Sequence, residues 1–364
     1  MSFGARALIR LGALENNFER VCAAANGAKV MAVVKANAYG HGLRTVVGNL
    51  PDADSFAVAR YSEALQLHDV GTGKPIVLLK GILDSEELSD ALYRGFEMVV
   101  HCARQVELLE RATTGNAIVW LKLDTGMRRL GFEPDRADDL IVRLNNCRSV
   151  AEVRLMTHLA NADDKDDDTT SRQLAAFRPI LRRFDGAFSI VNSAGLLGWP
   201  ETIAASYDSS RSWVRAGLCL YGVSPFPGTS GGDFGLKPVM EFSSKLIGVK
   251  VLRAGDAVGY GGTWKASAPT RLGIVSAGYG DGYTRFLPSG TPVLVDGRRV
   301  ALVGRVSMDM AAVDLGADAT DEPGAPVTLW GPGLPVEEVA AHAGTIPYQL
   351  LSGLTHRERS EVLE

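Results

Sequence analysis

Short apolar runs alternate with longer amphipathic stretches between residues 29 and 217. The runs are rich in β-branched residues, while the stretches place apolar residues at helical spacing and often begin with Ser, Thr or Asp. This alternation of strand and helix predicts a parallel sheet. The expected strands are residues 29–34, 55–58, 75–79, 97–100, 117–123, 150–157, 188–192 and 213–217.

Eight strands is the number that closes a (β/α)8 barrel. The same alternation also fits an open, doubly wound sheet, in which a GxGxxG turn commonly follows the first strand. The segment after residue 34 reads KANAYGHG and contains no such turn. The sequence therefore predicts an α/β fold with an N-terminal (β/α)8 barrel of the TIM type.

The pattern changes at SPFPGTSGGDFGLKP (224–238), a Pro/Gly/Ser-rich linker. Beyond it we expect antiparallel strands over 242–252, 271–277 and 325–330, a hairpin over 293–304 closed by Asp296 and Gly297, and one helix over 335–344. The expected domains are a barrel over 1–228 and a mainly antiparallel β domain over 229–364. An initial strand near residues 5–10 can pack with the second domain.

Composition places the chain among ordinary globular proteins. Apolar residues make up 46% and charged residues 22%, with a net charge of -4, which favours a small-molecule partner over nucleic acid. We find no stretch of the roughly 20 apolar residues that span a bilayer, and Glu15 interrupts any signal-peptide core, so a cytoplasmic location without membrane contact is expected. The four cysteines form no CxxC pair, and no metal site is expected.

Polar residues follow several expected strands, where barrels of this type place their catalytic side chains. Lys35 comes after the apolar run VMAVV, and burial there would lower the pKa of its amine and make it a nucleophile toward an aldehyde. Taken alone, Lys35 also fits an ordinary surface lysine. Lys122, Asp124, His158, Asn192, Ser193 and Arg215 lie in or after other expected strands.

The segment AVVKANAYGHG (32–42) resembles the cofactor-attachment motif of alanine racemases, which are pyridoxal-phosphate enzymes of fold type III with a barrel and a C-terminal β domain. Further matching segments follow in order down most of the chain. The resemblance implies that pyridoxal 5'-phosphate is bound by Lys35, Tyr39, His158, Asn192, Ser193, Arg215, Gly217, Leu218 and Tyr348. Lys35 would carry the cofactor covalently, and Arg215 would donate to the pyridine nitrogen, which restrains reactions other than proton exchange.

The segment KLDTGMRRLGF (122–132) implies that Arg129, rather than Arg128, binds near the substrate carboxylate. Lys122 occupies a position that is often carbamylated in relatives, and a carbamate would orient Arg129. The expected substrate site is completed by Tyr279, Met308 and Asp309.

Racemisation needs a second acid/base group opposite Lys35. The resemblance assigns this role to Tyr260 in AVGYGGTW (257–264), with His158, linked to Arg215, as its neighbour. It also implies a homodimer in which Tyr260, Tyr279 and Met308 reach the barrel of the other subunit. The implied function is interconversion of L- and D-alanine, either to supply D-alanine for peptidoglycan or to degrade it.

Two alternatives stay open at this point. One is a broad-specificity amino-acid racemase or another fold type III enzyme such as a decarboxylase, although decarboxylases place an acidic residue where this chain has Arg215. The other is a non-catalytic pyridoxal-phosphate-binding protein, although such proteins consist of the barrel only. The tail THRERSEVLE (355–364) departs from the ending common in relatives.

Overall fold

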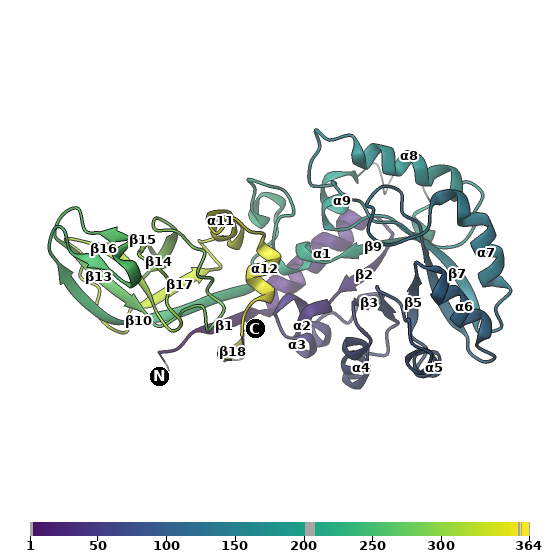
Figure 1. The fold of residues 1–364 in the computed structure, drawn as a ribbon, viewed down its shortest axis with the longest axis horizontal. Helices are drawn as coiled ribbons and strands as arrows, with labels where there is room; N and C mark the ends of the chain where they lie inside the picture. Colours follow the sequence, from purple (N-terminus) through teal and green to yellow (C-terminus); the bar gives the residue numbers. More distant parts are fainter. Residues whose placement is uncertain (1–2, 201–207, 356, 358, 364) are drawn as a thin grey trace.

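The computed structural model describes residues 3–200, 208–355, 357 and 359–363. A helix-wrapped barrel lies at one end of an elongated molecule, and a β-sheet lies at the other (Figure 1). Among the described residues, we find no helix with the length and apolar character needed to cross a membrane.

Eight parallel strands form a closed barrel in sequence order, with β2 also paired to β9. They are β2 (Lys29–Val33), β3 (Ser55–Val58), β4 (Ile76–Leu78), β5 (Glu97–Val100), β6 (Ala117–Lys122), β7 (Val150–Met156), β8 (Phe188–Ser189) and β9 (Ser212–Ala216). Five of them, β3, β4, β5, β8 and β9, are buried throughout, as parallel strands covered on both faces are. The predicted barrel is confirmed.

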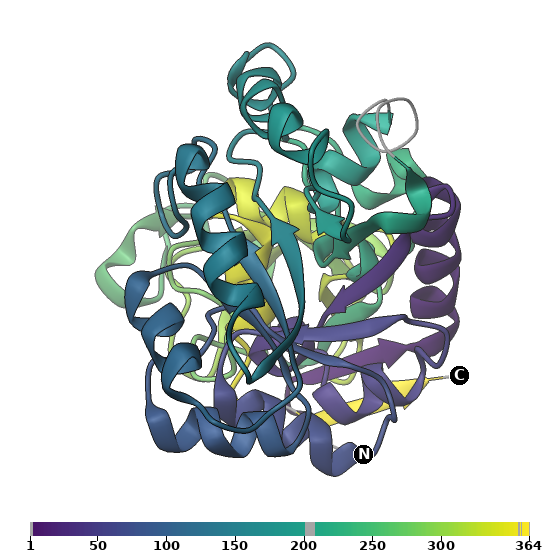
Figure 2. The ribbon, with the colours of Figure 1, turned by 90° about the vertical axis from the view of Figure 1, so that its right-hand side faces the viewer.

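Helices surround the barrel when it is seen end-on (Figure 2). They are α1 (Leu11–Ala25), α2 (Lys35–Tyr39), α3 (Leu43–Gly48), α4 (Tyr61–Val70), α5 (Ser85–Tyr93), α6 (Ala103–Arg111), α7 (Ala137–Asn145), α8 (Thr169–Leu181) and α9 (Ser193–Gly198). The helix α5 illustrates the capping that the sequence predicts, because the Asp84 carboxylate accepts hydrogen bonds from the N–H groups of Glu86 and Glu87.

A charged cluster closes the barrel near the N-terminal ends of its strands. The Glu97 carboxylate is buried and accepts a hydrogen bond from the Trp120 indole at 2.7 Å. Arg154 lies 3.3 Å from both Glu97 oxygens, and its guanidinium stands over the Trp120 and Trp213 rings at 5.2 and 5.3 Å. This face is opposite the one at which such barrels place catalytic groups, so we assign the cluster to stability.

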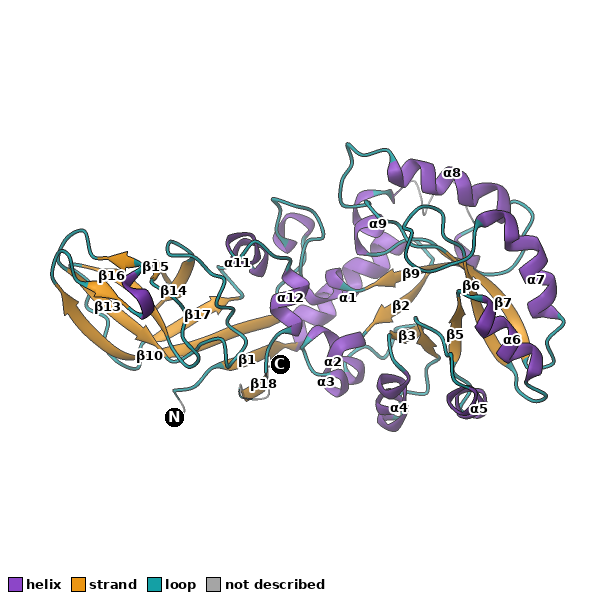
Figure 3. Ribbon diagram, viewed as in Figure 1, coloured by secondary structure: helices purple, strands orange, loops and turns teal. Residues whose placement is uncertain are grey.

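The second sheet has eight strands in the order β13-β16-β15-β14-β17-β10-β1-β18 (Figure 3). They are β1 (Arg6–Arg10), β10 (Met240–Leu252), β13 (Thr270–Val275), β14 (Pro292–Val295), β15 (Arg298–Val303), β16 (Ala311–Gly316), β17 (Pro326–Trp330) and β18 (Arg359–Leu363). All neighbouring strands are antiparallel except β1 and β18. The predicted mainly antiparallel β region is confirmed.

The first and last strands of the chain lie in this second sheet. β1 pairs with β10, with Ala7 opposite Phe242, and also with β18, with Ala7 opposite Ser360. The predicted hairpin joins β14 to β15, and its two turn residues Asp296 and Gly297 both have positive φ, at 48° and 77°. That is the backbone that a two-residue hairpin turn requires.

Smaller elements complete the second region: β11 (Ala257–Val258), β12 (Trp264–Lys265), α11 (Val336–His342) and α12 (Pro347–Ser352). α11 lies within the predicted helix over 335–344. The structure adds α12, which the sequence analysis missed, and packs it against α2 of the barrel. Gly40 makes this approach possible, because a Cβ atom there would lie 2.1 Å from the carbonyl oxygen of Leu351.

Candidate active site

Lys35 lies at the C-terminal mouth of the barrel, at the start of a left-handed turn. The strand β2 ends at Val33, one residue before the predicted bound at 34, and Lys35 begins α2. Residues 36–39 follow with φ of 52–53° in every case. Left-handed backbone costs L-residues roughly 1–2 kcal/mol each, so the surrounding contacts must stabilise this turn.

Lys35 and Lys122 share a strongly positive environment. Burial, followed by the charge of Arg129, lowers the pKa of the Lys35 amine, while Glu63 acts in the opposite direction. Lys122 ends β6 and is buried, and burial with the charges of Arg215 and Arg129 lowers the pKa of Lys122 to about 8. Both amines therefore lose a proton more readily than a solvent-exposed lysine does.

Arg128 and Arg129 are adjacent in the sequence but lie in different surroundings. Arg128 is turned to solvent, where it forms a 2.8 Å ion pair with Glu133. Arg129 is the one whose charge acts on both Lys35 and Lys122. Its position is therefore compatible with binding an anionic group at the barrel mouth.

Arg215 is buried in β9 and its guanidinium is held from several sides. Nη2 donates to the carbonyl oxygen of Thr157 at 2.7 Å and to that of Ile190 at 3.0 Å, and Nη1 lies 2.5 Å from Ser189 Oγ. The strand β8 is shorter than the predicted 188–192, and Ile190, the residue after it, accepts from this side chain. Burial lowers the pKa of Arg215 to about 9, so the guanidinium stays charged at neutral pH.

His158 is the neighbour of Arg215, with Nδ1 3.1 Å from Nη2. Burial and the Arg215 charge hold the pKa of His158 well below its ordinary value, so the ring is neutral. A guanidinium can only donate, so Nδ1 accepts and the ring proton is on Nε2. The structure thus brings together the two residues that the resemblance links.

A second cluster lies where β8 and β9 lead into the next segments. Ser193 Oγ accepts hydrogen bonds from the backbone N–H groups of Gly217 and Cys219, at 3.2 and 3.3 Å. Converging amides of this kind form an anion-binding concavity. A Cβ atom at Gly217 would lie 2.8 Å from the Tyr39 hydroxyl, so that hydroxyl lies close against the Gly217 backbone.

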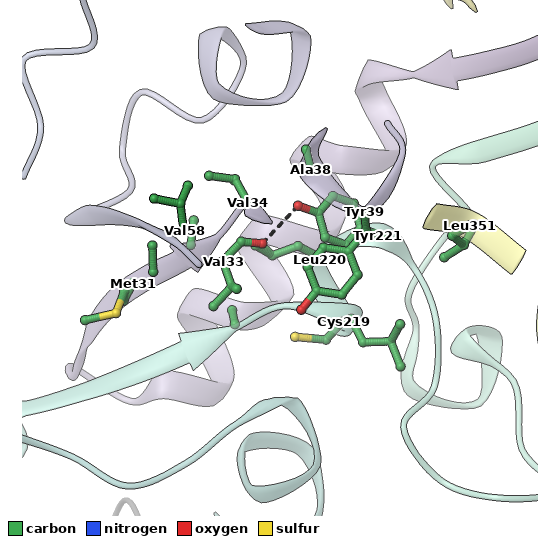
Figure 4. Packing of buried hydrophobic residues seen from close by; sticks show 14 of the residues in the cluster. Met31, Val33, Val34, Ala38, Tyr39, Val58, Cys219, Leu220, Tyr221 and Leu351 are labelled. Atoms are coloured by element: carbon green, nitrogen blue, oxygen red, sulfur yellow. Dashed lines mark hydrogen bonds between the residues drawn. The ribbon is translucent and has the colours of Figure 1, made fainter. Parts of the chain in front are cut away.

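Aromatic rings pack beside these amides. The rings of Tyr39 and Tyr221 stack with centroids 4.8 Å apart, and Figure 4 shows them next to Cys219. The ring centroid of Tyr348, in α12, lies 5.7 Å from that of Tyr39. A cavity of about 470 Å³ extends along this side, with His158, Asn192, Leu218 and Tyr348 in its wall. Asn192 also caps α9 by accepting from the Gly195 N–H at 3.0 Å.

Tyr260 lies in the second region of the molecule, away from Lys35 of the same chain. It follows β11 and lines a cavity of about 550 Å³ together with residues of β10, β13 and β16. Of these strands, β13 and β16 stand at the end of the molecule far from the barrel (Figure 1). The side chain is 67% exposed. Within one chain, the structure does not bring the two expected acid/base groups together.

Tyr279, Met308 and Asp309 share this second region. Tyr279 and Met308 are exposed, and Asp309 forms a 2.7 Å ion pair with Arg357. Arg357, which also lies 3.9 Å from Asp281, is a contact that sequence reasoning missed. In the described part of the chain, no cluster of His, Cys, Asp and Glu is suited to a metal ion.

Comparison with known proteins gives consistent matches along the chain. Residues 9–225 match the alanine racemase N-terminal domain, and residues 239–362 match the alanine racemase C-terminal domain. The chain is 48% identical to an alanine racemase of Vibrio cholerae over 97% of this chain and 96% of the relative, and 49% identical to one of Shewanella sediminis over 97% of each.

Solved structures agree. The biosynthetic alanine racemase of Pseudomonas aeruginosa superimposes with a TM-score of 0.94 at 41% identity, covering 100% of both chains. The alanine racemase of Bartonella henselae with covalently bound pyridoxal phosphate has a TM-score of 0.86 at 28% identity, covering 99% of each chain.

Proposed function

Because the chain belongs to the alanine racemase family, whose members use pyridoxal phosphate to interconvert L- and D-alanine, we propose that Lys35 and Tyr260 are its two acid/base groups. The observation that carries this proposal is the half-buried Lys35 amine, whose pKa is lowered, at the catalytic mouth of the barrel. An amine of this kind is suited to condense with an aldehyde and then to accept and return a proton.

The residues at the mouth fit pyridoxal 5'-phosphate. The amides that converge on Ser193 Oγ suit a phosphate dianion, and the bare Cα of Gly217 leaves space beside the Tyr39 hydroxyl. The buried Arg215 guanidinium would face the ring nitrogen and keep its own charge. The proposed cofactor contacts are Lys35, Tyr39, His158, Asn192, Ser193, Arg215, Gly217, Leu218 and Tyr348.

When bound, pyridoxal phosphate supplies an aldehyde for the amine and a conjugated ring that makes the substrate Cα more acidic. Lys35 exchanges a proton with Cα on one face. Inversion requires that the proton return on the other face, and we assign this step to the Tyr260 hydroxyl. A tyrosine hydroxyl has a pKa near 10, so the proposal requires a neighbouring positive charge, for which the Arg215–His158 pair is our candidate.

The proposed site is composite, with Tyr260, Tyr279 and Met308 contributed by a second copy of the chain. The support is that these side chains are exposed on the β region while Lys35 lies at the barrel mouth. A homodimer with two-fold symmetry would supply both groups to both sites.

Mixing two inactive variants, Lys35→Ala and Tyr260→Phe, tests this arrangement. Random exchange of subunits would regenerate about a quarter of the sites, because each mixed dimer has one site with both groups. A mixture that exchanges subunits, as mass spectrometry can verify, yet remains inactive would refute the composite site.

For the substrate carboxylate we propose Arg129, with Tyr279, Met308 and Asp309 lining the same pocket. We further propose that Lys122 is carbamylated. Its pKa of about 8 leaves part of the amine neutral at physiological pH, and the neutral amine adds to CO2 with loss of one proton. The resulting anion would orient Arg129. A ¹³C carbamate resonance after exposure to labelled CO2, absent in Lys122→Met, would support this modification.

The direct test is chemical. Borohydride treatment of the reconstituted protein should fix the cofactor on the peptide that contains Lys35, and the protein should form D-alanine from L-alanine. A panel of other L-amino acids distinguishes an alanine racemase from a broad-specificity enzyme. Loss of the cofactor after borohydride treatment and dialysis, with no modified Lys35 peptide, would refute the assignment.

Similarity to a biosynthetic alanine racemase favours D-alanine supply for peptidoglycan over degradation. A cytoplasmic location stays a prediction. Growth of a deletion strain with and without D-alanine, and fractionation of a tagged chain, would test the two points.

A further inference from the structure

Two side chains outside the site described above contact the left-handed turn at both of its ends. The first is Glu63, on α4. Its Oε1 atom accepts a hydrogen bond from the backbone N–H of Ala36, the residue after Lys35, at 2.7 Å. Its Oε2 atom accepts from the N–H groups of Ala59 and Arg60, both at 2.9 Å. One carboxylate thus ties the beginning of the turn to the segment that follows β3.

The second is His41, which follows the turn and is fully buried. Its Nδ1 atom lies 3.0 Å from the carbonyl oxygens of both Ala38 and Tyr39. Because both partners are acceptors, Nδ1 must carry the proton and donate. Burial lowers the pKa of His41 to about 4, so the ring is neutral. Nε2 has no hydrogen-bond partner among the described residues, so within that part of the chain the ring forms hydrogen bonds through Nδ1 alone.

The His41 ring also belongs to an aromatic stack. Its centroid lies 4.5 Å from that of Tyr221, whose other neighbour is Tyr39 at 4.8 Å (Figure 4 shows the two tyrosines). The Tyr221 hydroxyl donates to the carbonyl oxygen of Val33 at 3.0 Å. The end of β2, the end of the turn and the Tyr39 ring are therefore held as one packed unit.

We propose that Glu63 and His41 are positioning residues that hold residues 36–39 left-handed and thereby direct Lys35 and Tyr39 into the barrel mouth. Ala and Tyr have no intrinsic preference for this backbone. Without the two contacts the turn would relax toward right-handed geometry, and Lys35 and Tyr39 would move apart. The proposal rests on the assignment of Lys35 and Tyr39 to the cofactor.

Glu63→Ala is the first test, with Asp84→Ala as its matched control. Each carboxylate caps the start of a barrel helix through two backbone N–H groups, but only Glu63 also binds Ala36. We would measure pyridoxal phosphate affinity of the apoprotein, amide hydrogen exchange over residues 36–43, and the melting temperature. Glu63→Ala should weaken cofactor binding about tenfold to a hundredfold, as expected for losing a charged hydrogen bond.

The two variants should lower the melting temperature similarly, while only Glu63→Ala accelerates exchange across the turn. Glu63→Gln keeps one acceptor oxygen, but its NH2 group can only donate, so it can serve either Ala36 or the pair Ala59 and Arg60 and should recover only part of the affinity. His41→Phe keeps a ring against Tyr221 but loses the Nδ1 donor, and should reproduce the exchange and affinity changes independently.

Wild-type affinity and exchange in both Glu63→Ala and His41→Phe would overturn the proposal. So would an equal loss of affinity in Asp84→Ala, because the effect would then be one of general stability. Failure of this proposal can be told apart from failure of the Lys35 assignment. Amide exchange in the apoprotein reports on the turn alone, whereas borohydride labelling reports on Lys35.

Discussion

Arg154 offers the sharpest test of how the barrel is stabilised. Its guanidinium is the cation next to the buried Glu97 carboxylate, at 3.3 Å from both oxygens. Arg154→Met would keep much of the packing against Trp120 and Trp213 and remove the charge. The Glu97 carboxylate would then be left with the Trp120 indole and no adjacent guanidinium, which is the costly way to break a buried ion pair.

The expected loss is about 3–5 kcal/mol in the free energy of unfolding. With an unfolding entropy of about 2.1 cal/mol/K per residue, this corresponds to a melting temperature about 4–7 °C lower for a chain of this length. Burial already raises the pKa of Glu97, and Arg154 acts against that rise, so the variant should raise it further. A carboxyl whose pKa is raised in the folded state binds protons more readily when the protein is folded, so protonation stabilises the fold. The stability that Arg154→Met loses relative to wild type should therefore shrink as pH falls toward the ordinary pKa of Glu.

Calorimetry and denaturant titration at several pH values would measure these effects. The double variant Glu97→Gln/Arg154→Met should recover most of the stability, because it removes both buried charges, and Glu152, the other carboxylate that binds Arg154, has a side chain that is 41% exposed. Racemase activity should persist in all folded variants, because the cluster lies on the face opposite the proposed site. A loss below 1 kcal/mol in Arg154→Met, or no recovery in the double variant, would refute the reasoning.

Three further predictions concern the proposed site. Tyr260→Phe should retain the cofactor absorbance but lower racemisation about 10²- to 10⁴-fold, measured in both directions by chiral chromatography; wild-type rates would contradict its role. Gly40→Ala places a Cβ atom 2.1 Å from the carbonyl oxygen of Leu351, at a residue whose φ is 84°, so it should displace α12 and weaken cofactor binding. The control is Gly71→Ala, which also has a positive φ but has open space around it and should leave cofactor binding unchanged. Lys122 has a folded-state pKa of about 8, against 10.5 when unperturbed, so it binds fewer protons folded than unfolded and should make stability rise between these pH values. Compared with wild-type protein kept free of carbamate, Lys122→Met should show a smaller rise on denaturation, and an identical pH profile would exclude this cause.

The sequence predicts the barrel well because its strands are buried on both faces and read as short β-branched runs. The segment 55–58 illustrates this, since the observed β3 has the same bounds. The hairpin at Asp296 and Gly297 was predictable because its turn chemistry is local. α12 was missed because six residues are too few to display a helical period, and its place depends on contact with a distant turn.

In the candidate site, too, some features could be predicted from the sequence and others could not. Lys35, His158 and Arg215 could be selected because a closed barrel brings the ends of its parallel strands to one face, and the structure places Arg215 against His158. The left-handed turn could not be predicted, because KANAY has no glycine and tertiary contacts override its preference. Glu63 likewise has no local signal, since its partner Ala36 lies in another element. Its role became visible only through the hydrogen bond.

The parallel pairing of β1 with β18 has a consequence for biosynthesis. The residues that form β1 are translated long before their partner on one side, residues 359–363. At about 5–20 residues per second, β1 waits tens of seconds for that neighbour. The pairing of β1 with β18 therefore forms only after residues 359–363 have emerged from the ribosome, and shorter nascent chains expose one unpaired edge of β1 to proteases and chaperones.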